Sequence, residues 1–162
     1  MPTRRDFLKL GSVAVAGLVA APPAAPGAAS AAETPRYPVL TIAPLKDIGA
    51  GATISFAYPD RHSPAMLLRL TAPAVGGVGP NQEIVAYSTL CTHKGCPVAF
   101  KPERKMLICP CHWSTFDPAK AGTLVIGQAS QHLPQIELRV DNGLVQAVGV
   151  AGLIYGRHTN IV

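Results

Sequence analysis

Two short stretches decide how this sequence is interpreted: CTHKGCP at residues 91–97 and CPCHWSTFD at residues 109–117. Together they contain all four cysteines of the chain, two of its five histidines and its single tryptophan. Glycine and proline lie among these residues, which is typical of loops rather than of regular strands or helices. The function of the chain is therefore sought in this region.

The two stretches offer a paired set of metal ligands. Cys91 and His93 are separated by one residue, Cys109 and His112 are separated by two, and fifteen residues lie between the pairs. Two thiolates and two imidazoles could form a tetrahedral zinc site. One cysteine and one histidine from each stretch also suit two loops that face each other across a binuclear iron cluster, with two thiolates on one iron and two neutral imidazoles on the other. The pairing favours the iron cluster, and visible colour would distinguish it from zinc.

The residues, their spacing and the second cysteine in each stretch resemble the two cluster-binding loops of Rieske proteins. The resemblance implies one Rieske-type [2Fe–2S] cluster per chain, with Cys91, His93, Cys109 and His112 as ligands, and a role as a one-electron carrier. It implies no catalytic residue on this chain, because such a carrier performs no substrate chemistry.

Three further expectations follow from the same resemblance. Cys96 and Cys111 match two positions that form a disulfide across the loops, although two reduced buried thiols are the alternative. Ser114 matches a residue whose hydroxyl donates to a bridging sulfide. Phe116 stands where quinol-oxidising members usually carry a tyrosine that donates to a ligand sulfur, so its lack of a hydroxyl is expected to lower the reduction potential.

Composition and patterning predict an all-β fold. The chain has 162 residues, of which 48% are hydrophobic and 14% are charged, and it is rich in glycine and proline without long helix-periodic segments. The run Asp141-Asn142-Gly143 predicts a tight hairpin turn. Together with the resemblance, this indicates an antiparallel β sandwich or barrel with a small cluster-binding subdomain inserted at about residues 88–130. The expected strands are Thr53–Tyr58, Met66–Leu70, Glu83–Ser88, Met106–Cys109, Leu124–Ile126, Ile136–Val140 and Leu144–Val150.

The N-terminal residues 1–32 have the layout of an export signal. Arg4 and Arg5 resemble the paired arginines of a twin-arginine (Tat) signal, an apolar run follows at residues 10–21, and small residues at 29–32 offer a cleavage site. The apolar run is shorter than the ~20 residues that span a bilayer, although an uncleaved anchor or a disordered basic tail is the alternative. We therefore expect a periplasmic protein with a signal at 1–32, a linker at 33–38 and a Rieske domain at 39–162.

The net charge gives no sign of a nucleic-acid partner. It is +5 for the whole chain and falls to +3 without the signal, which holds three basic residues and one acidic residue. The remainder has no dense lysine or arginine run of the kind that binds phosphates.

Three stretches beyond the cluster loops resemble the small subunit of arsenite oxidase: VIGQA at 125–129, LPQI at 133–136 and GLIYGR at 152–157. This resemblance extends over about residues 85–157. It implies a large molybdopterin and iron–sulfur catalytic subunit that oxidises arsenite to arsenate, with a cytochrome c or cupredoxin as electron acceptor. The alternative is the Rieske subunit of a quinol-oxidising cytochrome bc-type complex, although such subunits usually carry the tyrosine that Phe116 replaces. A ring-hydroxylase ferredoxin is opposed by the export signal and by the extra cysteine pair.

Overall fold

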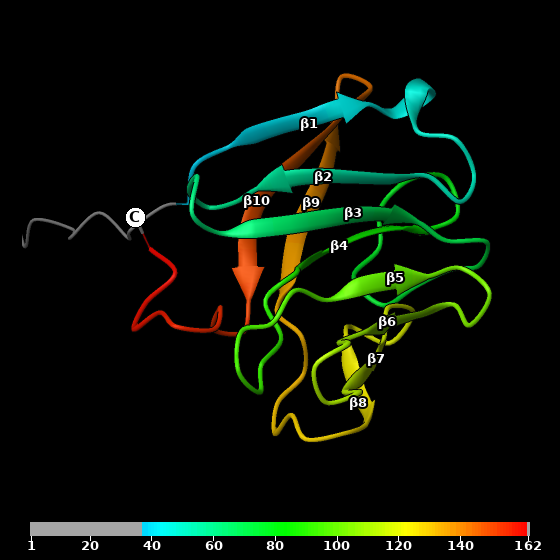
Figure 1. Ribbon diagram of the computed structural model, residues 1–162. Helices are drawn as coiled ribbons and strands as arrows, with labels where there is room; N and C mark the ends of the chain where they lie inside the picture. Colours follow the sequence, from blue (N-terminus) through cyan, green and yellow to red (C-terminus); the bar gives the residue numbers. More distant parts are fainter. Residues whose placement is uncertain (1–36, 162) are drawn as a thin grey trace, which may run out of the picture. The chain divides into compact units, whose positions relative to one another are not determined.

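The computed structural model describes residues 37–161, which form two antiparallel β-sheets (Figure 1). The six-stranded sheet has the order β1-β10-β9-β4-β3-β2, and the four-stranded sheet has the order β5-β6-β7-β8. The strands are β1 (Leu40–Pro44), β2 (Thr53–Ala57), β3 (Pro64–Arg69), β4 (Ile84–Ser88), β5 (Ala99–Lys101), β6 (Met106–Ile108), β7 (Thr115–Asp117), β8 (Thr123–Ile126), β9 (Gln135–Asp141) and β10 (Leu144–Ala151).

The all-β prediction is confirmed. Within the described residues the one helix is a single 3₁₀ turn, η2 (Leu45–Asp47), and no helix there is long and apolar enough to cross a bilayer. The predicted signal at 1–32 and residues 33–36 of the predicted linker lie outside the described residues. The small sheet spans residues 99–126, which falls inside the subdomain predicted at about 88–130.

Strand β4 joins the two halves of the fold because both of its faces are buried. Its residues alternate between two apolar cores: Ile84 and Ala86 pack into the core of the large sheet, whereas Val85 and Tyr87 pack into a second core shared with the small sheet. Side chains on a strand point to opposite faces in turn, so a run with no polar alternation requires cover on both sides. The Tyr87 hydroxyl also donates to the carbonyl of Pro118 at 2.8 Å, which ties the sheets together.

The second core positions the candidate ligands. It contains Leu107 of β6, Phe116 of β7 and Leu133, all essentially inaccessible to water, together with Cys91 and Cys109. Burial of a leucine or phenylalanine side chain contributes roughly 1.5–3 kcal/mol. The two cysteine loops are therefore anchored at their bases by the same apolar contacts that hold the sheets together.

Seven strands lie where the sequence predicts them, with ends shifted by one or two residues, and three were not predicted. Strands β5 and β7 have three residues each, too few to show a two-residue period, and both are completed by hydrogen bonds to β6. Strand β1 pairs with β10 at the edge of the large sheet and none of its five residues is fully buried, so its apolar signal is weak.

The predicted hairpin turn is confirmed between β9 and β10. Asp141 pairs with Leu144, and the two residues between them, Asn142 and Gly143, have φ values of 48° and 74°. Asparagine and glycine tolerate this left-handed conformation better than other residues, which is why the pair predicts the turn.

Candidate metal centre

Two loops with the same backbone hydrogen bonds carry the predicted ligands. In the first loop (residues 91–97) the Cys91 carbonyl accepts from Gly95 N–H at 2.8 Å, and Cys91 N–H donates to the carbonyl of Cys96 at 2.9 Å. In the second loop (residues 109–114) the Cys109 carbonyl accepts from Trp113 N–H at 3.0 Å, and Cys109 N–H donates to the carbonyl of Ser114 at 2.9 Å. Each cysteine thus begins an equivalent tight turn.

The fifth position of each turn requires a positive φ. Gly95 has φ 72° and Trp113 has φ 60°. Glycine adopts this conformation freely, whereas for a bulky residue it costs about 1–2 kcal/mol. Trp113 therefore carries backbone strain, and its side chain is 69% exposed. The indole lies open to solvent, not packed over the neighbouring residues.

The thiols of Cys91 and Cys109 meet in the second core. Both residues are buried and neither is in a disulfide. Burial raises the pKa of the Cys91 thiol, and the adjacent Cys109 thiol raises it further, whereas the N–H groups of His93 and Lys94 act in the opposite direction. Two thiolates side by side in an apolar pocket need a compensating positive charge, which bound metal ions provide.

The two histidines face each other across the loops. The ring centroids of His93 and His112 lie 4.7 Å apart, with the planes nearly perpendicular at 82°. The Nδ1 atom of His93 is buried and has no hydrogen-bond partner. A buried ring nitrogen without a partner is costly unless it binds a metal.

These observations fit a [2Fe–2S] cluster of the Rieske type. The structure brings together two buried thiols and two adjacent imidazoles from two turns of the same geometry. Two sulfur and two nitrogen donors, one pair from each loop, are the donor set that such a cluster takes.

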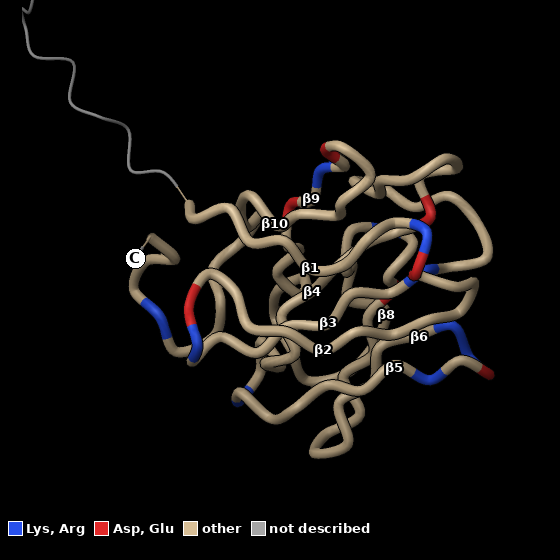
Figure 2. Tube along the Cα trace, turned by 90° about the horizontal axis from the view of Figure 1, so that it is seen from above, with Lys and Arg blue, Asp and Glu red and all other residues tan. Residues whose placement is uncertain are grey.

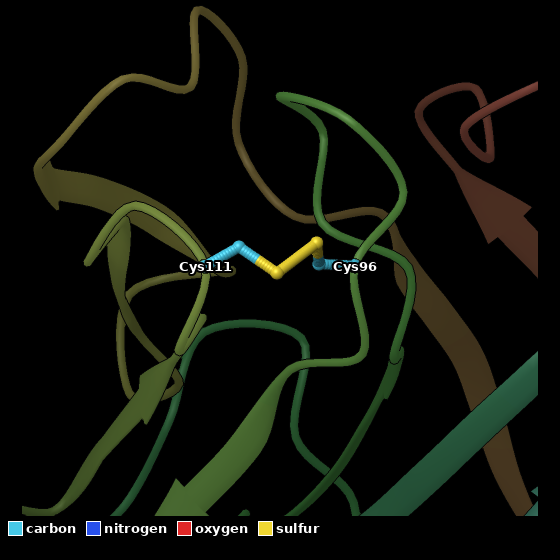
Figure 3. The surroundings of a disulfide bond; sticks show 2 residues. All are labelled: Cys96 and Cys111. Carbon is cyan, nitrogen blue, oxygen red and sulfur yellow. A yellow bond between two sulfur atoms is a disulfide. The ribbon is translucent and has the colours of Figure 1, made fainter.

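A disulfide between Cys96 and Cys111 links the two loops (Figure 3). Its Cα atoms are 6.5 Å apart, and it closes a sequence separation of 15 residues. The sulfur atoms of Cys96, Cys109 and Cys111 lie within 4.8 Å of one another, but the two in the disulfide cannot act as thiolate ligands. The predicted pairing is therefore confirmed, and the disulfide lies directly beside Cys109.

A third loop (residues 127–132) packs against both others. Thr92 of the first loop donates through its hydroxyl to the carbonyl of Gln131 at 2.9 Å. Gly127 approaches the second loop so closely that an added Cβ would lie 2.3 Å from the Cα of Ser114. An isolated glycine next to a strand was the one signal of this close approach.

The two predicted tuning residues are both buried beside the predicted ligands. The oxygen of Ser114 accepts from Ala129 N–H at 3.0 Å, which leaves its hydroxyl hydrogen available for donation. Phe116 is fully buried in the core that holds Cys91 and Cys109. Their roles toward a cluster stay predictions.

The other histidines take ordinary positions. His62 follows β2 in a turn and His158 lies near the C-terminus, both exposed. His132 accepts from Leu124 N–H at 3.2 Å through Nδ1, which secures the end of the third loop. The structure brings none of these three histidines into the pair formed by His93 and His112.

A family model described as Rieske [2Fe-2S] domain matches residues 42–137. Two curated relatives match nearly the whole chain. The iodate reductase subunit IdrB of Denitromonas iodatirespirans is 39% identical and covers 98% of this chain and 86% of its own length. The subunit of the same name from Pseudomonas sp. strain SCT is 36% identical and covers 95% and 82%.

Two further comparisons cover less of the chain or show only the fold. The cytochrome bc1 complex Rieske iron–sulfur subunit of Streptomyces lividans is 42% identical over 71 residues, which is 43% of this chain and 42% of the relative. The soluble domain of the Rieske protein II (soxF) from Sulfolobus acidocaldarius superposes with a TM-score of 0.67 at 24% identity, over 75% of this chain and 82% of that chain.

Replacing Cys111 by serine tests the disulfide as a clamp. Cys111→Ser is expected to keep its iron and visible spectrum after gentle purification but to lose the cluster several-fold faster on warming. The chain-entropy model gives about 3 kcal/mol for a closed loop of this length, an upper value where a cluster joins the same loops. Absorbance decay at fixed temperature measures the effect, and Cys96→Ser should behave alike. An unchanged decay rate would contradict a clamping role.

Adding a hydroxyl at Phe116 tests the tuning of the reduction potential. Phe116→Tyr is expected to raise the potential by tens of millivolts, because one hydrogen bond to a ligand sulfur stabilises the reduced state and about 59 mV is tenfold in a one-electron equilibrium. Protein-film voltammetry measures the shift. Phe100→Tyr is the matched control, because Phe100 packs against the same core from β5. Equal potentials for both variants and the parent would show that the Phe116 ring does not face a ligand sulfur.

Proposed function

Because the chain belongs to the Rieske [2Fe–2S] domain family, we propose that it is the one-electron carrier subunit of an oxidoreductase whose substrate chemistry takes place on a separate, larger subunit. The proposed ligands are Cys91, His93, Cys109 and His112. The geometry that supports them is the meeting of two equivalent turns at two buried thiols and two facing imidazoles.

The residues of this chain have distinct tasks in that proposal. A bound [2Fe–2S] cluster takes up and releases one electron at a time. Cys91 and Cys109 supply thiolates from a dry core, which stabilises ferric iron and keeps water from the sulfur atoms. His93 and His112 supply neutral imidazoles, which bring less negative charge and make reduction easier. The exposed position of His112 allows a redox partner to approach closely.

Similarity along nearly the whole chain supports a subunit of the same kind of oxidoreductase as these relatives. The two iodate reductase subunits match 98% and 95% of this chain, whereas the bc1 subunit matches 43%. Phe116 also opposes a quinol-oxidising subunit, because such subunits usually carry a tyrosine at this position. The quinol-oxidising bc-type complex is the alternative.

Two substrates are candidates for the catalytic subunit, which we expect to carry molybdenum. The names of the two relatives support iodate reduction, in which this chain would pass electrons to the large subunit. The residues at 125–129, 133–136 and 152–157 resemble the arsenite oxidase small subunit, in which electrons would flow the other way, to a cytochrome c or cupredoxin. A carrier serves either direction, and the potentials of its partners decide which.

The surface around the three loops suits a stably bound partner. Trp113, Val125 and Ile126 are large, apolar and exposed, and within the three loops Lys94 is the one formally charged side chain. Interface centres are poor in charge and rich in aromatic residues. The cysteine loops precede β5 and follow β6, so the turn between these strands lies at their opposite ends. The lysine and arginine residues of that turn are blue in Figure 2.

We place the protein in the periplasm, after export by the Tat pathway. The support is the paired arginines and apolar run of the N-terminal segment together with the Cys96–Cys111 disulfide, since such bonds persist in oxidising compartments. Cleavage near residue 32 would release the domain, whereas a retained segment would hold it at the membrane.

The ligand set is tested by metal content. Protein from its native host is expected to contain two irons and two acid-labile sulfides per chain. His93→Ala or His112→Ala is expected to lose them, because each removes one of the two protein ligands to one iron. His132→Ala is the control and should keep its iron. Stoichiometric zinc without iron, or full iron in both ligand variants, would refute the assignment.

The partner and substrate are tested on the complex isolated from the native host with its large subunit. Bleaching of the oxidised visible spectrum by arsenite would identify arsenite oxidation. Its return in the reduced complex on adding iodate would identify iodate reduction. The isolated chain should respond to neither at a comparable rate, because it lacks the catalytic subunit. If a quinol reduced the complex and neither arsenite nor iodate changed its spectrum, the proposal would be contradicted and the bc-type complex favoured.

A further inference from the structure

The residues that follow β10 form a compact segment held by its own hydrogen bonds, which we call the C-terminal clasp (residues 152–160). Ile154 is buried in the core of the large sheet. The Asn160 side chain accepts from Ile154 N–H at 3.0 Å and donates to the carbonyl of Gly152 at 2.6 Å. The clasp is therefore an ordered segment with a defined conformation, although it contains no helix or strand.

Arg157 ties the clasp to the turn between β2 and β3. Its Nη1 donates to the Asp60 carboxylate at 2.5 Å and to the Ser63 hydroxyl at 2.6 Å. Both charged side chains are partly shielded from solvent, and Ser63 is buried. A partly shielded ion pair with a further hydrogen bond holds its geometry better than an exposed pair.

The neighbouring Tyr155 lies directly on the first loop. A Cβ added at Gly95 would come within 2.6 Å of Cδ1 and 2.7 Å of Cε1 of the Tyr155 ring, so the ring fills the space that a side chain at this position would take. Gly95 is the positive-φ residue whose N–H closes the turn onto Cys91. Tyr155 thus contacts the backbone of the loop that carries Cys91 and His93.

The two equivalent turns differ in this respect. At the matching position the second loop carries Trp113, whose side chain points to solvent. The first loop has no side chain there and is covered by a residue about 60 positions later in the sequence. The contact of Tyr155 with the first loop therefore arises from the tertiary structure and not from the sequence of the loop itself.

We propose that Tyr155, anchored through the Arg157–Asp60 ion pair, is a positioning residue that holds the first loop at Gly95 and so retains the cluster and limits the access of water to it. The inference rests on the proposed function, in which Cys91 and His93 of that loop are ligands. With two thiolates, two sulfides and two ferric irons the oxidised centre is neutral, and the reduced centre carries one negative charge. Water admitted by loss of the ring stabilises that charge and raises the potential.

The test uses the full chain with its cluster. Tyr155→Ala is expected to lose the cluster about tenfold faster in the presence of a chelator, since removal of a native contact speeds opening of the loop, and to have a higher reduction potential. Tyr155→Phe should match the parent because the ring, not the hydroxyl, makes the contact. Leu153→Ala removes an exposed apolar side chain from the same segment and is the control.

Coupling between residues makes the test independent of any single variant. Gly95→Ala introduces both backbone strain at a positive φ and a clash with the Tyr155 ring. In the Tyr155→Ala background only the backbone strain remains. Gly95→Ala should therefore accelerate cluster loss less in that background than in the parent. Asp60→Asn and Arg157→Gln each remove the ion pair but leave the Tyr155 ring in the protein. Each should accelerate loss in the parent and add little in the Tyr155→Ala background, whereas Arg61→Gln should have no effect.

The outcomes separate this inference from the proposed function. Parent-like cluster lifetime and potential in Tyr155→Ala, with two irons per chain, would overturn the clasp and leave the ligand set intact. Lower thermal stability without a change in potential would show a structural role only and would also overturn it. Iron retained in both His93→Ala and His112→Ala would refute the ligand set instead.

Discussion

The burial of two cysteine thiols in the apolar core that joins the two sheets is the constraint on which this structure depends. Cys91 and Cys109 lie among Leu107, Phe116 and Leu133, so the same contacts that stabilise the fold bring the two loops together. An apolar pocket makes thiolates unfavourable without a nearby positive charge, as the raised pKa of Cys91 reflects. A binuclear metal centre resolves this conflict, and for that reason we expect fold stability and metal binding to be coupled in this protein.

The two loops reach the centre through the same backbone device but are stabilised differently. The second loop is braced by the third through Ser114, Ala129 and the close approach of Gly127. The first loop is braced by the hydrogen bond that Thr92 donates to the third loop and by the contact of the C-terminal clasp with Gly95. The Cys96–Cys111 disulfide then joins them, so that each loop is held by neighbours from distant parts of the chain.

The two sides of the centre differ in exposure. In the first loop His93 is half-buried and Tyr155 lies on Gly95, whereas His112 and Trp113 on the second loop are exposed. A bulky residue kept at positive φ costs stability, and such strain persists where function outweighs the cost. The open, nearly uncharged surface beside His112 is accordingly the side on which a redox partner would have the shortest approach in the proposed function.

Local chemistry in the sequence was sufficient to predict the all-β class, the hairpin at Asn142-Gly143 and the six cysteine and histidine positions of interest, because spacing and turn propensity are properties of neighbouring residues. The pairing of Cys96 with Cys111 followed from resemblance to a family. The short strands β5 and β7 escaped prediction because three residues carry no period and depend on hydrogen bonds to β6. The contact of Tyr155 with Gly95 and the Arg157–Asp60 ion pair join residues about 60 and 97 positions apart. Only the tertiary structure decides such contacts, because they arise from how the sheets pack and leave no local pattern in the chain.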